Sequence, residues 1–283
     1  MTEQKILSWI ENYNTTETKK GASTALNSLK LYLQDNNLKE SEWISSMKES
    51  DDNKYLLLNE YRKSLDLMPA SVRKYYAFVK SYLRVIHGIK LDIEDQKQYI
   101  KFKPVAKVNR EPLIKDVIKI LCQNSKDYYK AFWLVQASSG MRASESILLK
   151  KENFDFSSNP VMVTIPAAVT KTQSERITFI SNEAVKAIQQ VDYFEPKTLD
   201  TIESYFWKLR KKLKLLDRYS NSRNYKINIH AFRSFFRTQA GKINQDFAET
   251  LIGHSGYLKQ YVRLEKSDLI KDYVKLEPKL KIF

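Results

Sequence analysis

The chain has 283 residues, which is enough for two domains, since a domain usually has about 100–200 residues. Lys and Arg number 48 against 33 for Asp and Glu, and the net charge of +15 favours a polyanionic partner, above all nucleic acid. No stretch approaches the ~20 apolar residues of a spanning helix and the N-terminus lacks a signal-peptide core, so we expect a cytoplasmic protein that does not enter a membrane. The single cysteine, Cys122, excludes an internal disulfide and a thiolate zinc cluster, and we expect it in the core.

Few glycines and prolines interrupt the chain, and its Lys, Glu and Leu content favours helices, so we predict a mainly α protein. The first hundred residues predict a run of helices. The clearest of them begins at Pro69 and ends before Gly88. Arg73, Lys80 and Arg84 share one face of this helix, and they either line a DNA backbone or form an ordinary solvated face.

The segment from Lys90 to Pro112 has poor apolar periodicity, two prolines and several basic residues, which is typical of an interdomain linker. We therefore place an N-terminal helical DNA-binding domain at 1–100, a basic linker at 101–111 and a second domain at 112–283. A basic linker between two basic domains suits a clamp that closes around duplex DNA.

The second domain is predicted to be mostly helical with a small antiparallel β element, which makes the whole chain mainly α (α+β). Two short β-branched runs predict the strands, at 161–165 and 176–180. Apolar periodicity predicts helices near 112–123, 127–138, 143–149, 181–190 and 199–216. We expect all four tryptophans in apolar cores: Trp9, Trp43, Trp133 and Trp207.

Three short motifs in this domain carry residues suited to phosphate chemistry. Gly140 allows a sharp turn before Arg142, and Glu145 follows at a distance from which it could orient that arginine. His230 and Arg233 are three residues apart, so a helix would place an imidazole and a planar guanidinium on one face. A second imidazole, His254, follows a glycine, and Tyr261 comes shortly after it.

In this order the motifs resemble those of the tyrosine recombinase, or phage integrase, family: Gly-x-Arg-x-Ser-Glu, a hairpin lysine, His-x-x-Arg, Gly-His and a tyrosine. The resemblance covers residues 107–283, with Lys171 in the connection between the predicted strands. The Arg73 helix is similar in character to the core-binding domain of the family. The segment around Tyr261 and the tail after it look most like archaeal integrases of plasmids and viruses.

The resemblance implies a site-specific recombinase that integrates or excises a mobile element through a 3′-phosphotyrosyl intermediate. It implies that Tyr261 is the nucleophile, His230 its proton acceptor and Lys171 the general acid. Arg142, Arg233 and His254 would bind the scissile phosphate, and Glu145 would support catalysis by orienting Arg142 or His230. Neither a metal nor a cofactor is implied. The implied partners are double-stranded DNA attachment sites in the nucleoid and three further copies of the chain in a tetramer on DNA, while the free protein can be a monomer.

Some alternatives stay open at this point. The interval from His254 to Tyr261 is short for the family, so Tyr257 and Tyr273 remain alternative nucleophiles. Plain solvated lysines are common in hairpins, and three other lysines are near Lys171 in the sequence: Lys150, Lys151 and Lys186. Two other functions compete with recombination: DNA relaxation as in type IB topoisomerases, and DNA binding without catalysis.

Overall fold

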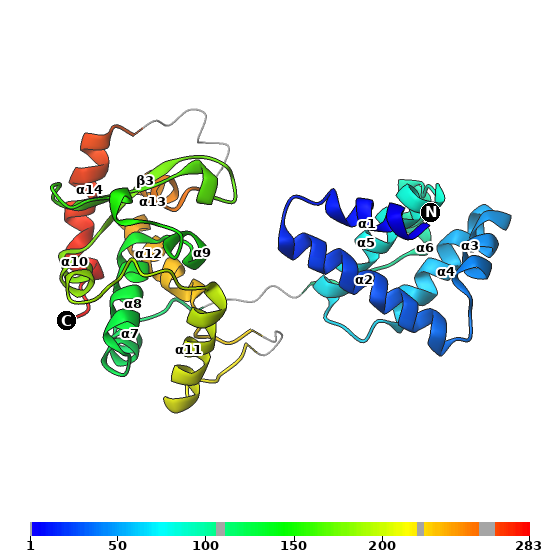
Figure 1. Cartoon of the computed structure of the whole chain (residues 1–283), viewed down its shortest axis with the longest axis horizontal. Helices are drawn as coiled ribbons and strands as arrows, with labels where there is room; N and C mark the ends of the chain where they lie inside the picture. The colour runs from blue at the N-terminus through cyan, green and yellow to red at the C-terminus, as the bar shows by residue number, and fades with distance from the viewer. Residues whose placement is uncertain (1, 106–110, 220–223, 255–263) are drawn as a thin grey trace. The chain divides into compact units, whose positions relative to one another are not determined.

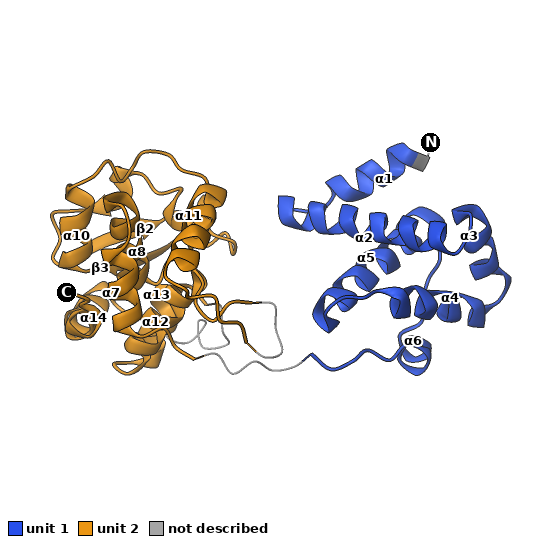
Figure 2. Ribbon diagram, turned by 90° about the horizontal axis from the view of Figure 1, so that it is seen from below, with its two compact units in different colours: residues 1–107 blue, residues 108–283 orange. Residues whose placement is uncertain are grey.

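The computed structural model describes residues 2–105, 111–219, 224–254 and 264–283. The chain forms two compact units, residues 1–107 and 108–283, each with its own apolar core (Figure 2). Residues 106–110 of the predicted linker lie outside the described residues, as do Tyr257 and Tyr261. None of the helices in the described ranges is long and apolar enough to cross a membrane.

The first unit consists of helices in the part of it that the structure describes (Figure 1). The helix that carries the basic face begins at Pro69 and ends at Gly88, whose φ of 71° gives the left-handed cap that glycine adopts without strain. The helices are α1 (Thr2–Glu11), α2 (Thr16–Asp35), α3 (Glu40–Glu49), α4 (Asp51–Ser64), α5 (Pro69–His87) and α6 (Ile93–Tyr99).

Helix α6 corrects the expectation that the chain is irregular from Lys90 onward. The side chain of Asp92 accepts hydrogen bonds from the backbone N–H groups of Glu94 and Asp95, so it starts the helix as an N-cap. Ile100, directly after α6, is buried in the core of the first unit. The helix has only seven residues, which is too short for an apolar stripe to show in the sequence.

The second unit is built around α8, whose residues from Ala131 to Ser139 are all buried. Helices α7, α10, α12 and α14 contact α8, and Tyr273 of α14 donates a hydrogen bond to the Ser138 carbonyl at 2.8 Å. The helices of this unit are α7 (Lys115–Gln123), α8 (Asp127–Ser139), α9 (Ala143–Ser146), α10 (Asn182–Gln189), α11 (Leu199–Lys212), α12 (His230–Gly241), α13 (Gln245–Ile252) and α14 (Lys266–Leu280).

A small antiparallel sheet of order β1-β2-β3 completes the second unit. Strands β2 (Val161–Ile165) and β3 (Arg176–Ile180) have the predicted bounds, and they pair from Val161 with Ile180 to Ile165 with Arg176. The two-residue strand β1 (Phe154–Asp155) was not foreseen, because two residues carry no alternating pattern. The prediction of a mainly α fold with a small antiparallel element is confirmed.

The predicted core residues are confirmed with one exception. Cys122 is buried, as are Trp9, Trp43 and Trp133. Trp207 on α11 is 45% exposed, so its assignment to the core was wrong. Phe206, the residue before it, lies on the buried face of α11.

Candidate active site

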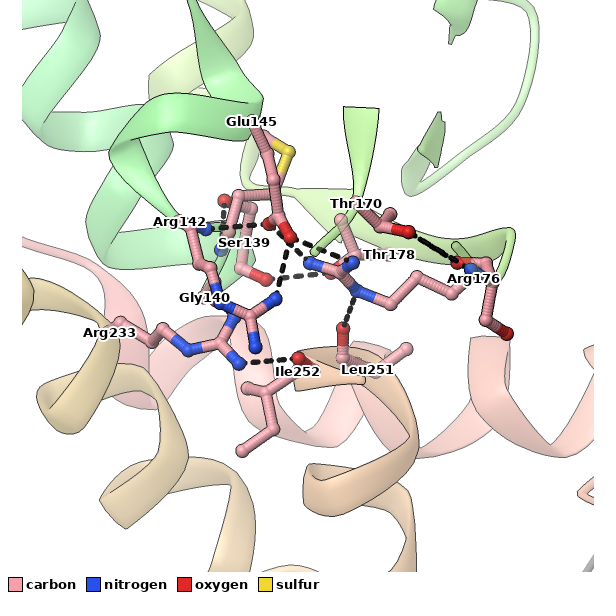
Figure 3. Close-up of polar contacts among 12 residues, drawn as sticks. Ser139, Gly140, Arg142, Glu145, Thr170, Arg176, Thr178, Arg233, Leu251 and Ile252 are labelled. Atoms are coloured by element: carbon pink, nitrogen blue, oxygen red, sulfur yellow. Dashed lines mark hydrogen bonds and ion pairs between the residues drawn. The ribbon is translucent and has the colours of Figure 1, made fainter. Parts of the chain in front are cut away.

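Segments that are far apart in the sequence meet in the second unit around a group of arginines (Figure 3). The segment Gly140–Arg142 leaves the end of α8, where Gly140 has a φ of 64°. A Cβ at this glycine would lie 2.3 Å from Cδ1 of Phe236, so both the backbone conformation and the space require glycine. Arg142 then becomes the N-cap residue of α9.

Glu145 is the centre of the polar contacts in this site, and its side chain is 1% exposed. Its carboxylate accepts hydrogen bonds from Nη1 of Arg142 at 2.6 Å and from the Arg142 backbone N–H at 2.8 Å. Arg176 adds two more, from Nη1 at 3.2 Å and Nη2 at 2.6 Å. Burial raises the pKa of Glu145, but these contacts outweigh burial and hold the pKa below its usual value. The carboxylate is therefore ionised and fixes the Arg142 guanidinium.

Arg233 comes from the first turn of α12 and is 4% exposed. Its Nη1 donates to the carbonyl of Gly140 at 2.6 Å, and its Nη2 donates to the carbonyl of Ile252 at the end of α13. Burial, together with the nearby charge of Arg142, lowers the pKa of Arg233 to about 10, so it stays protonated at neutral pH. Two guanidinium groups thus lie close together, and their mutual repulsion favours an anion between them.

His254 follows Gly253, which ends α13 with a φ of 67°. The His254 backbone N–H donates to the Glu249 carbonyl at 3.2 Å, as in a Schellman motif. This cap also brings Nδ1 of His254 to 2.7 Å from a carboxylate oxygen of Glu249, which binds Arg237 as well. The hydrogen bond at Nδ1 fixes the orientation of the imidazole, and the His254 side chain remains half exposed.

His230 is the first residue of α12 and is exposed. The amino end of a helix carries a partial positive charge, so the end of α12 at which His230 lies favours an anion. His230 is one of the residues that line a surface pocket of about 590 Å³. Residues of α11 line it as well, among them Trp207, which is exposed, and Arg210, which is buried.

Lys171 lies in the connection between β2 and β3, as predicted, and it is exposed. Thr170 closes the base of this connection: its hydroxyl donates to the Ser174 carbonyl and accepts from the Ser174 N–H, at 3.1 and 3.0 Å (Figure 3). Lys171 is therefore the first residue of a turn that the contacts between Thr170 and Ser174 close.

The predicted residues Arg142, Glu145 and Arg233 come together in the structure, and the backbone that precedes His254 joins them through the Ile252 carbonyl. Tyr261 lies outside the described residues. Three side chains of the network were not predicted: Arg176, Glu249 and Arg237. Glu249 had a signal in its position five residues before His254 across a glycine cap. Arg176 had none, because no local spacing connects it with Glu145.

The basic residues predicted on α5 lie in the first unit. Arg73 is exposed, donates to the Lys103 carbonyl at 3.2 Å and has its guanidinium carbon 5.0 Å from the Phe102 ring centre. Lys80 donates to the Gln96 side chain, and Arg84 is exposed. Arg73 and Lys80 are thus both bound to the segment that follows α5.

The sequence from 111 to 266 matches the model of the phage integrase family. This match spans more than half of the chain and contains all the motifs on which the resemblance rests. The chain belongs to the phage integrase family. It is therefore a tyrosine recombinase, an enzyme that cleaves and rejoins DNA in site-specific recombination, and its partner is DNA. The two alternative functions are not favoured by the match.

Solved structures support the fold of this recombinase. A lambda integrase (75–356) dimer bound to a COC′ core site is 15% identical with a TM-score of 0.64, covering 94% of this chain and 97% of that one. The Tn1549 transposon integrase in complex with transposon right end DNA is 17% identical with a TM-score of 0.53, covering 78% and 84%. Among curated proteins, none matches the recombinase.

Proposed function

We propose that the recombinase cuts one DNA strand at a time by attack of the Tyr261 hydroxyl on the scissile phosphorus. The phosphorus–oxygen bond to the 5′-oxygen breaks, and a 3′-phosphotyrosyl bond replaces it. One phosphoester bond is exchanged for another, so a 5′-hydroxyl from a second strand reverses the step without ATP. The observation that carries this proposal is the convergence of Arg142 and Arg233 in a chain of this family. Arg142 binds the Glu145 carboxylate and Arg233 binds the Gly140 carbonyl, so the segment from Gly140 to Glu145 holds both arginines.

Arg142 and Arg233 bind the non-bridging oxygens of the scissile phosphate in this mechanism. Negative charge builds on these oxygens as the phosphorus becomes five-coordinate, and cations that are already fixed stabilise it without reorganisation. The contacts of Glu145 with Arg142, and of two carbonyls with Arg233, supply that fixation. His254, oriented by Glu249, donates a further hydrogen bond to the same phosphate.

Two proton transfers complete the step. A phenol has a pKa near ~10, so Tyr261 needs a proton acceptor at neutral pH, and His230 is the acceptor that we propose. The departing 5′-oxygen needs a proton in turn, and Lys171 supplies it from the turn between β2 and β3. The exposed position of Lys171 suits a residue that reaches the leaving group only when DNA is bound.

Recombination joins two DNA sites, and it requires four strand cuts. We propose that four copies of the chain assemble on the two attachment sites of a mobile element, for integration or for excision. Arg73, Lys80 and Arg84 of α5 contact the DNA backbone in this assembly, so the first unit contributes affinity and the second unit chemistry.

The test is covalent capture on a nicked or phosphorothiolate duplex, on which the cut strand cannot be rejoined. The wild type is compared with Tyr261→Phe in EDTA, and protein–DNA adducts that resist SDS are measured. We expect a metal-independent adduct in the wild type and none in Tyr261→Phe.

Two matched tyrosine variants control this experiment. Tyr257→Phe changes another tyrosine of the same segment, and Tyr273→Phe changes one whose hydroxyl is buried against the Ser138 carbonyl. Burial raises the pKa of Tyr273 well above its usual value, which makes it a poor nucleophile. If Tyr261→Phe forms the adduct undiminished and Tyr257→Phe forms none, the nucleophile is Tyr257 and not Tyr261.

A further inference from the structure

Arg176 is a buried cation in the second unit that none of the catalytic motifs contains. It is the first residue of β3, directly after the connection that carries Lys171, and it is 9% exposed. A buried guanidinium is costly unless its donors are satisfied. Glu145 accepts from both of its terminal nitrogens, and the Leu251 carbonyl accepts from Nε at 3.1 Å.

These contacts lead to two different phosphate-binding groups. On one side, Arg176 binds Glu145, and Glu145 also makes an ion pair of 2.6 Å with the Arg142 guanidinium. On the other side, Nε of Arg176 binds the last turn of α13, just before His254. A single side chain therefore joins the strand that follows Lys171 to the segments of Arg142 and His254 (Figure 3).

The space beside Gly253 shows how closely Arg176 fits against the His254 segment. A Cβ at Gly253 would lie 2.7 Å from Cδ and 2.9 Å from Nε of Arg176. The glycine therefore serves two purposes: it adopts the left-handed cap and lets the arginine side chain pass directly over it. Any movement of Arg176 would be transmitted to the backbone next to His254.

We propose that Arg176 is a positioning residue for DNA cleavage, which sets Arg142 through Glu145 and His254 through the end of α13. The inference rests on the proposed function, because it assumes that Arg142 and His254 bind the scissile phosphate. Arg176 is assigned no contact of its own with the phosphate, and it acts only through these neighbours. Its fork of donors matters, since two parallel bonds to Glu145 and a third to Leu251 fix three segments at once.

The experiment measures single-turnover adduct formation on the nicked duplex with Arg176→Met and Arg176→Lys. Thermal unfolding of each variant is recorded first, and rates are compared at a temperature at which every variant is folded. A misplacement of about 1 Å can cost about 100-fold in rate, so we expect a loss of that order at saturating DNA for Arg176→Met. Arg176→Lys keeps the charge beside Glu145 but not the fork, and we expect an intermediate rate.

Two further measurements separate positioning from a general structural effect. The DNA concentration that gives half the maximal rate should change by less than about threefold, because the loss lies in the transition state and not in DNA binding. The double variant Arg176→Met with Glu145→Gln should lose little more than the worse single variant, because the two changes share the effect on Arg142 and only Arg176→Met also affects His254. Tyr273→Phe, which removes a buried hydrogen bond of the same unit, is the control and should keep the wild-type rate.

The outcomes distinguish this inference from the function on which it rests. A wild-type rate in folded Arg176→Met, or losses that add fully in the double variant, would overturn the positioning role and leave the nucleophile assignment intact. A wild type that forms no adduct on cognate attachment-site DNA would overturn the proposed function first.

Discussion

Two carboxylates organise the two sides of the candidate active site, and they do so in different surroundings. Glu145 has a side chain that is 1% exposed and binds Arg142 and Arg176, whereas the Glu249 side chain is 29% exposed and binds Arg237 and His254. Burial raises the pKa of each carboxyl group, but the hydrogen bonds from Arg142 and Arg176 to Glu145, and from Arg237 and His254 to Glu249, hold it below the usual value. A carboxylate that binds two side chains is thus used once in the interior, at Glu145, and once near the surface, at Glu249.

The difference decides how much each carboxylate matters to the fold. A charge pair near the surface gains little, because water already solvates both partners. A buried carboxylate between two guanidinium groups leaves uncompensated charge behind when it is removed. We therefore expect the Glu145 network to be both a structural and a functional element, and the Glu249 network to be mainly a means of orienting His254.

The largest effect on stability is expected for Glu145→Ala. Two arginines would lose their common partner, and Arg176, itself buried, would keep only the Leu251 carbonyl among the contacts described above. Breaking a buried ion pair from one side costs about 3–5 kcal/mol. Urea unfolding followed by circular dichroism measures this loss. A loss below about 1 kcal/mol, the value of an exposed pair, would show that the two networks are energetically alike.

Arg233 connects the two networks, since it binds the Gly140 carbonyl beside Arg142 and the Ile252 carbonyl beside His254. For Arg233→Lys we expect the adduct rate at saturating DNA to fall by about 100- to 1,000-fold, as when one donor to a developing oxyanion is lost. DNA affinity, measured by fluorescence anisotropy, should change little, because most of it comes from many other phosphate contacts. A parallel loss of affinity and rate would argue that Arg233 only maintains the fold.

The sequence predicted the parts of the candidate active site that produce a pattern in the local sequence. The strands 161–165 and 176–180 were bounded correctly because turn residues flank β-branched runs. His230 and Arg233 lie on one helix, the condition under which their spacing predicted a shared face. The position of Arg142 beside Glu145 follows from a three-residue interval around a helix start. Resemblance to the family supplied the long-range part, namely which motifs act together.

The burial of Arg176 and the exposure of Trp207 could not be predicted, because they depend on contacts that leave no pattern in the local sequence. Arg176 stands 31 positions from Glu145, and in a short strand an arginine usually indicates the exposed face. Its burial follows only from the way β3 lies against α13 and α8. The expectation for Trp207 was wrong for a related reason. Of two adjacent aromatic residues on a helix, one can be buried, as Phe206 is, while the other is exposed.

The contribution of the buried Glu145 carboxylate to stability should appear as a difference in pH dependence between the wild type and Glu145→Gln. The pKa of Glu145 is lower in the folded state than in the unfolded chain, where it is near ~4.3. Its contribution to stability is therefore complete above that value and is lost as the pH falls through the folded-state pKa. Melting temperatures between about pH 3 and pH 7 should show a steeper fall in the wild type than in Glu145→Gln. Parallel curves would mean that Glu145 titrates as it does when unfolded.

Glu249→Ala should give the smallest effect on stability and completes the comparison. Its partners are about half exposed, so we expect a loss of at most about 1 kcal/mol in urea unfolding. The adduct rate should still fall by about tenfold, because the His254 ring would lose the hydrogen bond at Nδ1 that orients it. The carboxylate partners of metal-bound histidines give the scale, since their removal typically costs about 10–100-fold. Arg237→Ala is the matched control: it removes the other partner of Glu249 and leaves the bond to His254 in place. Equal rates for the two variants would show that the carboxylate does not act through His254, and a rate loss confined to Glu249→Ala would separate orientation from stability at this site.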